Sequence, residues 1–381
     1  MVVVGDYFLN VKLAGVPIVT DMRGLEYLNI FMGLDRLVPY LNIRVQDTAG
    51  ILTQLAPGDV LTSLLSVGFQ SVLDREYKEF DFRIVKRVPE GDWASSVFKA
   101  FAVLNLPGLF ASRCRAFENM YWEEIFAQIA REVGATQVEL SPGLNFRVSL
   151  VQPCKSNAWL LNYLEDRLSD CFIYFVLKGK DVVLRVVSLS WLFRQPVKKK
   201  FSLGDRMFQD AYALREYEFV EDAGVLSLLG VRGQEVLYFD YEKGSWELQT
   251  YSPEDYLSLS SYLLVDKSEK DYSFCCPGRT NDVFDVKKVG EGKFSKKLLN
   301  MSHVWVSVDP VFDIVPGDIV EVECLQSLCQ EKPMVWRMSG KWLVKRVIYQ
   351  FGVSVAMRML LCRPGIETDD ETTSLLKGRK V

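Results

Sequence analysis

Histidine is almost missing from this 381-residue sequence, in which His303 is the only one. A catalytic triad or a Cys–His pair needs an imidazole to take up a proton, so any such site must use His303. His303 lies in an alternating stretch, Met301–Trp305, whose pattern is typical of a β-strand. The sequence also lacks G-x-G-x-x-G, G-x-x-x-x-G-K-[ST] and H-E-x-x-H motifs, the usual signals of dinucleotide, nucleoside triphosphate and zinc-protease sites.

The cysteines have the wrong spacing for a metal site or a disulfide framework. Eight are scattered along the chain, and none forms a C-x-x-C pair. Zinc sites use Cys and His ligands at fixed spacing, and a single histidine leaves such a cluster incomplete. We therefore expect reduced, mostly buried thiols, no catalytic, cofactor-binding or metal-binding residues, and no cofactor.

Long apolar runs and a strong excess of one charge are absent as well. No run of 18 apolar residues occurs, and the N-terminus reaches Asp6 without a basic segment. We therefore expect neither a membrane-spanning segment nor a signal peptide. The net charge of −4 does not favour nucleic-acid binding. The basic cluster Lys198-Lys199-Lys200 is expected to be a solvated loop.

Acidic and aromatic residues are plentiful, and each group allows an alternative interpretation. Paired carboxylates could hydrolyse a glycosidic bond, but Glu123-Glu124 and Glu165-Asp166 lie on or near predicted polar helix faces, where solvated charges are the default. Aromatic strand residues could bind a sugar, although packing is their commoner use. The candidates are Tyr238, Phe239, Tyr241, Trp336, Trp342, Tyr349 and Phe351. Nothing in these patterns indicates an enzyme.

A short sequence motif is present twice in the chain. Pro57-Gly58-Asp59-Val60 precedes Ile84–Val88, and Pro316-Gly317-Asp318-Ile319 precedes Leu343–Val347, at one common offset of 259 residues. Pro-Gly-Asp is strong turn chemistry, and the residues after each copy alternate as half-buried strands do. Two unrelated hairpins could share these residues. The alternative is one β-domain present twice.

The order of the expected elements predicts a mostly β, α+β chain of several domains. We expect a first β-barrel at 1–110, an α/β domain at 111–190 and a second, discontinuous barrel at 191–250 and 296–364. An insertion at 251–295 and a flexible tail at 365–381 complete the chain. The two small barrels are expected to be antiparallel and similar to each other.

Two amphipathic helices are expected in the central domain. Asn119 and Ser156 are candidate N-caps, and Gly134 is a candidate C-terminal residue of the first helix. Their expected buried faces contain Trp122, Phe126, Ile129, Leu160 and Leu164.

This domain order resembles the baseplate hub proteins of contractile phage tails and the N-terminal half of the VgrG spikes of type VI secretion. In that family an α/β domain with a Gln, a turn and a helix follows the first barrel, and Gln152–Leu161 resembles that stretch. The second barrel of the family is interrupted by an insertion and closes with a Pro-Gly turn and a hairpin, as Pro316-Gly317-Asp318 and 342–361 do. Many members have a histidine in this hairpin, where Val347-Ile348-Tyr349 stands here.

The resemblance implies a structural protein and not an enzyme. It implies a homotrimer whose chains each supply two tail-tube-like barrels, so that six barrels form a ring. This ring would join the hexameric tail tube, or a tube-initiator protein, to a trimeric central spike protein, and DNA would pass through its lumen. Baseplate wedge proteins and the tape-measure protein are further expected partners. The expected location is the tail baseplate of a virion that is made in the host cytoplasm.

Two alternatives remain open from the sequence. One is a carbohydrate-active or peptidoglycan-degrading tail-associated enzyme, which needs a cleft with converging carboxylates and a perturbed pKa. The other is a stand-alone binding module with an exposed aromatic groove.

Overall fold

The computed structural model describes the greater part of the chain. The described residues are 2–4, 7–19, 24–47, 64–71, 77–91, 96–144, 146–168, 170–203, 211–221, 234–240, 243–251, 262–263, 273–275, 289, 292–293, 296, 299, 302–324, 338–363 and 366–367. The first copy of the repeated turn, Pro57–Val60, and residues 368–381 of the expected tail lie outside them.

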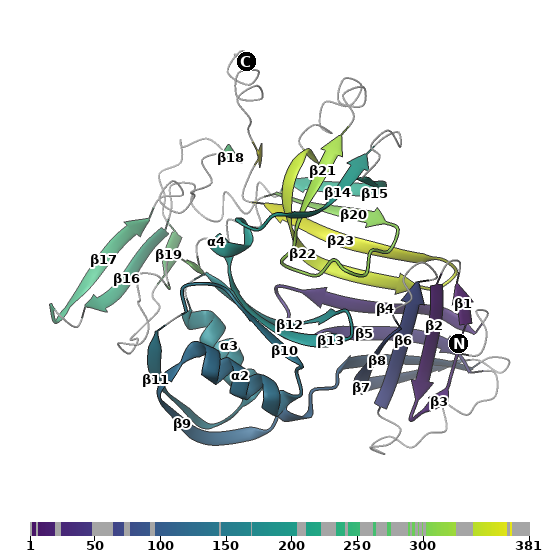
Figure 1. Ribbon diagram of the computed structural model, residues 1–381, viewed down its shortest axis with the longest axis horizontal. Helices are drawn as coiled ribbons and strands as arrows, with labels where there is room; N and C mark the ends of the chain where they lie inside the picture. Colours follow the sequence, from purple (N-terminus) through teal and green to yellow (C-terminus); the bar gives the residue numbers. More distant parts are fainter. Residues whose placement is uncertain are drawn as a thin grey trace, which may run out of the picture.

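Six antiparallel strands form an N-terminal β-unit within residues 2–104. They lie side by side in the order β2-β6-β7-β8-β5-β4 (Figure 1). Buried and more exposed residues alternate along β2, β4 and β5, so one face of the sheet supplies the core. The short strands β1 and β3 pair with β2. The bounds are β1 Val2–Val4, β2 Tyr7–Leu13, β3 Val16–Pro17, β4 Leu25–Gly33, β5 Tyr40–Gln46, β6 Leu64–Ser71, β7 Lys78–Gly91 and β8 Ser96–Leu104.

Six later strands form a C-terminal β-unit, which is a closed barrel. Its strands follow the order β14-β21-β22-β23-β20-β15, and the pairing of β14 with β15 closes the circle. The bounds are β14 Val197–Leu203, β15 Ala211–Glu221, β20 Ser302–Val308, β21 Ile319–Cys324, β22 Gly340–Phe351 and β23 Val355–Arg363.

The two β-units have the same strand order, but the N-terminal unit is not the closed barrel that was expected: among the described strands, β4 pairs with β22 and not with β2. If the six strands of each unit are numbered along the chain, both sheets read 1-4-5-6-3-2. The irregularities match too. Strand β4 skips one residue between Leu25 and Tyr27 opposite β5, and β15 skips one between Leu214 and Glu216 opposite β20. Both skips are β-bulges at the same place in the second strand.

A second matching bulge lies in the fifth strands, which carry the repeated Lys-Arg. Strand β7 leaves Val85 unpaired opposite β8, and β22 leaves Lys345 unpaired opposite β23. Lys86 and Lys345 therefore lie on equivalent strands, as the repeat predicts. Their positions differ by one residue in register, because Lys86 corresponds to Arg346.

One strand breaks the match between the units. Strand β2 is antiparallel to β6, whereas β14 is parallel to both of its neighbours, β21 and β15. The mostly β, α+β class is confirmed, but the second barrel is not wholly antiparallel as expected. The physical reason is the short link from the central unit: only residues 193–196 separate β14 from helix α4, so β14 must begin at the adjacent end of the barrel.

An α/β unit follows the N-terminal β-unit in the chain and lies beside both β-units (Figure 1). Strand β10 is parallel to β13, β12 is antiparallel to β13, and β9 and β11 form a separate two-stranded ribbon. The bounds are η2 Pro107–Leu109, β9 Ser112–Tyr121, α2 Trp122–Val133, β10 Gln137–Leu140, β11 Arg147–Ser156, α3 Asn157–Arg167, β12 Cys171–Lys178, β13 Asp181–Ser188 and α4 Leu189–Leu192. Among the described residues, no helix is long and apolar enough to cross a membrane.

Both expected helices are present, with one change of cap. Gly134 ends α2 in the left-handed conformation, and Ser156 caps α3 by accepting a hydrogen bond from the Trp159 N–H. Asn119 is not a cap, because it lies in β9, and Glu124 instead accepts from the Tyr121 N–H at 2.8 Å. The predicted apolar faces are fully buried: Trp122, Phe126, Ile129, Leu160 and Leu164.

The remaining strands form two small sheets outside the barrel. Strands β16 (Gln234–Asp240) and β17 (Ser245–Tyr251) pair with each other, and β16 also pairs with β19 (Ser273–Cys275). Strands β16 and β17 are therefore in a sheet of their own, although the expected second barrel, at 191–250 and 296–364, included β16 and most of β17. Strand β18 (Tyr262–Leu263) pairs with β24 (Ile366–Glu367). Residues 366–367 are therefore in a strand, although the expected flexible tail included them.

Candidate functional site

The second copy of the repeated turn is bound to strand β22. Gly317 has a φ of 91°, in the left-handed region that glycine adopts without strain. Its N–H donates to the Val344 carbonyl at 2.8 Å, and the Val344 N–H donates to the Asp318 carbonyl at 2.9 Å. The Pro-Gly-Asp turn and the strand segment of the second copy thus contact each other directly.

The α/β unit holds the same turn from the other side. The Tyr174 hydroxyl on β12 donates to the Pro316 carbonyl at 2.9 Å, and Arg185 Nη1 on β13 donates to it at 2.5 Å. A Cβ atom at Gly317 would lie 2.4 Å from the Tyr174 hydroxyl and 2.8 Å from Arg185 Nη1. Glycine is therefore the residue that allows the two units to approach this closely.

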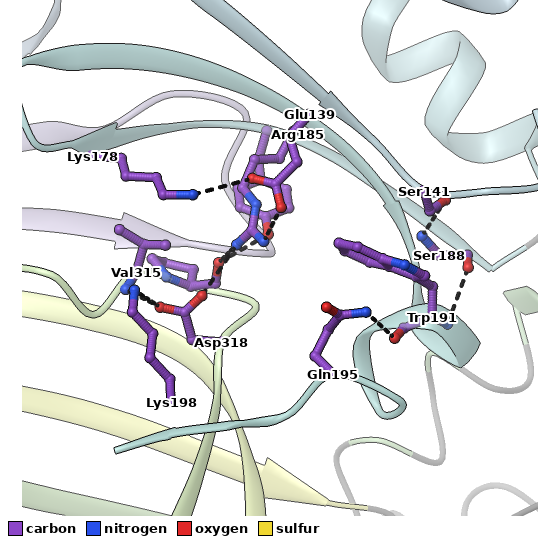
Figure 2. A network of polar contacts seen from close by, with 12 residues as sticks. Glu139, Ser141, Lys178, Arg185, Ser188, Trp191, Gln195, Lys198, Val315 and Asp318 are labelled. Carbon is purple, nitrogen blue, oxygen red and sulfur yellow. Dashed lines mark hydrogen bonds and ion pairs between the residues drawn. The ribbon is translucent and has the colours of Figure 1, made fainter.

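Two carboxylates lie beside Arg185, whose side chain is almost wholly buried: Glu139 on β10 and Asp318 in the turn before β21. Arg185 Nη2 donates to Glu139 Oε1 at 2.9 Å, and Nη1 lies 3.8 Å from Asp318, which also binds Lys198 Nζ at 2.7 Å (Figure 2). Burial alone lowers the pKa of Arg185, but Tyr174, Glu139 and Asp318 outweigh it and hold that pKa above its ordinary value. The buried charge is thus paired on both sides, which a buried ion requires.

The N-terminal β-unit meets this junction through strand β4. Strand β4 pairs with β22 from Leu28 opposite Phe351 to Gly33 opposite Arg346. Just beyond, Arg346 Nε donates to both carboxylate oxygens of Asp35 at 3.0 Å. Burial raises the pKa of Asp35, but the Arg346 hydrogen bond and the charges of Arg346 and Lys345 hold it below its usual value.

The end of β4 also contacts the α/β unit. The Phe175 N–H on β12 donates to the Leu37 carbonyl at 2.8 Å, and the Leu177 N–H donates to the Met32 sulfur at 3.4 Å. All three units therefore meet at one place. We call it the three-way joint, and it consists of residues 32–37, 174–185, 314–318 and 343–346.

An aromatic cluster ties the two β-units together beside this joint. Phe69 on β6 lies 4.8 Å from Phe312 and 5.6 Å from Phe351 between ring centroids, and Phe312 lies 5.0 Å from Tyr349. Phe69, Tyr349 and Phe351 are almost wholly buried. Burial of four rings from two units is a large apolar contribution to their attachment.

Sequence reasoning missed a second polar cluster, inside the α/β unit. Arg115 Nε donates to Gln152 Oε1 at 2.8 Å, Arg115 Nη2 donates to Asn157 Oδ1 at 2.9 Å, and Arg115 also pairs with Glu132. Asn157 Nδ2 donates to the Gly108 carbonyl at 3.1 Å. These mutual bonds fasten α2, α3 and β11 together. The sequence drew attention to Gln152 through the family-like motif, but nothing local indicated its distant partners.

The residues considered for chemistry are dispersed. His303 lies within β20, opposite Val220 and Cys362, as a strand histidine is expected to lie. Glu123 and Glu124 are exposed, as expected. Glu165 differs, because it is half-buried and its carboxylate lies 3.6 Å from Lys296 Nζ. Burial raises its pKa, so the prediction of a solvated charge is wrong there.

Two further expectations can be checked against the described residues. The basic cluster is not a loop: Lys198, Lys199 and Lys200 lie on β14 and pair with acidic groups that include Asp318 and Glu321. The aromatic candidates Trp342, Tyr349 and Phe351 are core residues, while Tyr241 and Trp336 lie outside the described part of the chain.

The thiols of the described part of the chain are both buried and exposed, and not mostly buried as expected. No group of three or more His, Cys, Asp and Glu residues there could hold a metal ion. Cys171 and Cys362 are buried, and burial raises the pKa of each thiol to about 12. Cys114 and Cys154, in contrast, are exposed.

Comparison with known proteins gives a likeness in structure alone. No protein-family model matches the sequence, and no curated protein matches it in sequence. Among solved structures, the tail protein of Neisseria meningitidis MC58 is similar over 95% of this chain and 98% of its own, with a TM-score of 0.59 and 10% identity.

Two further structures agree with this likeness. The 43 kDa tail protein of prophage MuSo2 from Shewanella oneidensis is similar over 94% of this chain and 98% of its own, with a TM-score of 0.61 and 9% identity. An E. coli component of the type VI secretion system, described as similar to the T4 tail proteins gp27 and gp5, is similar over 94% of this chain and 77% of its own, with a TM-score of 0.54 and 11% identity. The chain therefore has the fold of these two tail proteins and of the larger part of this type VI secretion component.

Proposed function

We propose that this protein is a structural component of a phage tail and forms the hub of its baseplate. The observation that carries the proposal is the presence of two β-units with one strand order and two matching bulges in a single chain. The likeness to tail proteins over nearly the whole chain supports it. In this role the protein transmits force and positions its partners, and it performs no turnover and needs no cofactor.

The duplicated unit explains how such a hub matches two symmetries. Three chains bring six similar β-units, so a ring of three chains presents nearly sixfold contacts to a hexameric tail tube or tube-initiator protein. The α/β units and the strand β14, whose direction differs from that of its counterpart β2, repeat only three times, which suits a trimeric central spike. Baseplate wedge proteins and the tape-measure protein complete the set of partners. DNA passes through the lumen during ejection.

The seam between β4 and β22 predicts how neighbouring chains meet. Near-equivalent contacts around a ring repeat the same pairing, and the strands equivalent to β4 and β22 are β15 and β7. By the matched registers, Asn29 corresponds to Glu218, and Ile348 corresponds to Val88. Strand β15 of one chain should therefore lie against β7 of the next.

Cross-linking and mass measurement test this arrangement. Asn29 and Ile348 are diagonal neighbours in the observed seam, because Asn29 lies opposite Gln350 and Ile348 lies opposite Phe31. The double variant Val88→Cys, Glu218→Cys, treated with a bis-maleimide long enough to span such a diagonal, should give covalent species of two and three chains. The single variants and the unmodified protein give the background. Native mass measurement, alone and with the spike protein, should show three copies. A tail particle with one, two or six copies of this chain about its axis would rule out the hub.

A further inference from the structure

Two exposed cysteines face each other across the β9–β11 ribbon. Arg113 lies opposite Lys155, and Arg115 lies opposite Gln152. One residue of β9, Cys114, therefore stands opposite two residues of β11, Pro153 and Cys154. This is a β-bulge, which redirects a side chain relative to the regular alternation.

The bulge places both thiols on the same side of the ribbon. Arg115 and Gln152 bond to each other on the face toward the helices, so the neighbouring Cys114 points to the opposite, outer face. Cys154 is exposed as well, and it stands opposite Cys114 in the bulge. The nearby Cys114 side chain is the main cause of a raised pKa of the Cys154 thiol.

The backbone at Cys154 is unusual for a cysteine. Its φ is 52°, in the left-handed region that side chains other than glycine rarely adopt and that costs free energy. Two well-bonded groups on either side of it, Gln152 and the Ser156 cap, hold this conformation in place. The strained residue is thus the one that brings its sulfur to Cys114.

We propose that Cys114 and Cys154 form a redox-active dithiol that closes to a disulfide within the chain by exchange with a small disulfide oxidant. The proposal goes beyond the structural function above and does not depend on it. The pair differs from Cys171 and Cys362, which are buried and which an oxidant in solution cannot reach.

The reaction balances in two exchange steps. One protein thiol loses its proton and attacks the S–S bond of the oxidant, which forms a mixed disulfide and releases one oxidant thiolate. The second protein thiol then loses its proton and attacks the protein sulfur of the mixed disulfide, which releases the other thiolate. The dithiol gives up two electrons and two protons, and the oxidant is reduced to two thiols.

Closure would fasten the part of the α/β unit that depends most on side-chain bonds. A two-stranded ribbon is marginal by itself. The disulfide would enclose residues 115–153, which contain helix α2 and the Arg115–Gln152 contact. A cross-link around such a segment restricts the unfolded chain and so stabilises the folded one.

The test uses the full-length native protein with oxidised glutathione. The unmodified chain should retain no glutathione on Cys114 or Cys154, and peptide mapping should find these two joined, with about 2 Da lost because two hydrogens leave. The variants Cys114→Ser and Cys154→Ser lack the second thiol, so each should keep one glutathione on its remaining cysteine. Glutathione left on both cysteines of the unmodified chain overturns the proposal, as does a link between two chains.

Two further measurements complete the test. Thermal unfolding of the oxidised protein should occur at a higher temperature than that of the reduced protein, and Cys114→Ser, Cys154→Ser together should abolish this shift. If native Cys114 and Cys154 stay unmodified while the urea-unfolded chain reacts, the folded pair is not redox-active and the proposal is wrong.

Discussion

At the scale of single residues, Gly317 determines how closely the α/β unit approaches the barrel. It combines a left-handed backbone with direct contact to the side chains that bind the Pro316 carbonyl. The repeated Pro-Gly-Asp motif identified Gly317 and Asp318 from the sequence. It gave no sign of Tyr174 and Arg185, because both stand in continuous apolar strands whose local pattern says nothing about a turn more than 130 residues away.

Gly317→Ala should destabilise the protein by at least about 2 kcal/mol. A left-handed alanine costs roughly 1–2 kcal/mol, and the new methyl group also displaces Tyr174 and Arg185. Gly179→Ala is the matched control, since Gly179 has a φ of 61° with open space around its Cβ position. Urea unfolding of both variants should separate strain from steric displacement. Equal losses of unfolding free energy in the two variants would show that Tyr174 and Arg185 move aside without an energetic cost.

Two glutamates should give stability opposite dependences on pH. Burial raises the pKa of Glu132, but hydrogen bonds from Arg115, Gln128 and Asn157 reverse this and hold it below its ordinary value. Its contribution is present above the ordinary glutamate pKa and is lost as the pH falls through the lowered one. Burial raises the pKa of Glu165, so its contribution is present at low pH and is lost as the pH rises through the raised value.

Free energies of unfolding for Glu132→Gln and Glu165→Gln, measured from pH 3 to 8, check these signs. The deficit of Glu132→Gln relative to the unmodified protein should shrink as the medium becomes acidic. Glu165→Gln should improve relative to the unmodified protein as the pH rises. Parallel curves for all three proteins would contradict both assignments.

At the scale of elements, the duplication was predictable but its register was not. The common offset in the sequence matched Val85 with Val344, yet the bulges make Ile84 the equivalent of Val344. Likewise, Ile319 corresponds to Leu64 and not to Val60, since these residues pair with equivalent positions of β7 and β22. Bulges and loops of unequal length shift each strand separately, and local patterns cannot record such shifts. The reversal of β14 was hidden for the same reason.

The corrected register predicts unequal effects at two valines that the sequence repeat matched. Val344 is wholly buried in β22, so Val344→Ala should cost about 2 kcal/mol through lost burial and a cavity. Val85 is a bulged residue with 56% of its surface exposed, so Val85→Ala should change stability by less than about 0.5 kcal/mol. Denaturant unfolding measures both. Similar losses would support the register of the sequence repeat instead.

At the scale of the whole molecule, the two β-units are joined as one body. The β4–β22 pairing and the aromatic cluster both cross from one unit to the other, and the α/β unit is fastened at the same place. A protein that transmits force between partners needs such continuity. We therefore expect the described units to unfold together.

Phe69→Ala should weaken this coupling as well as the core. Loss of a buried phenylalanine costs about 3–5 kcal/mol, and Phe69 contacts rings of the C-terminal β-unit. Calorimetry should show one transition for the unmodified protein and two for Phe69→Ala. Phe126→Ala, in the α2 core, is the control with a similar cost. Two transitions in the unmodified protein would show that the units are independent.

The pairing of β4 with β22 also has a consequence for synthesis on the ribosome. Strand β4 ends at Gly33, but its partner is complete only at Phe351, so a nascent chain carries an open β4 edge for about 15–60 s at ordinary elongation rates. Open edges accept any suitable strand. Where the β22 of a neighbouring nascent chain reaches that edge first, an exchanged dimer forms, so we expect the share of exchanged dimers to increase with the level of expression.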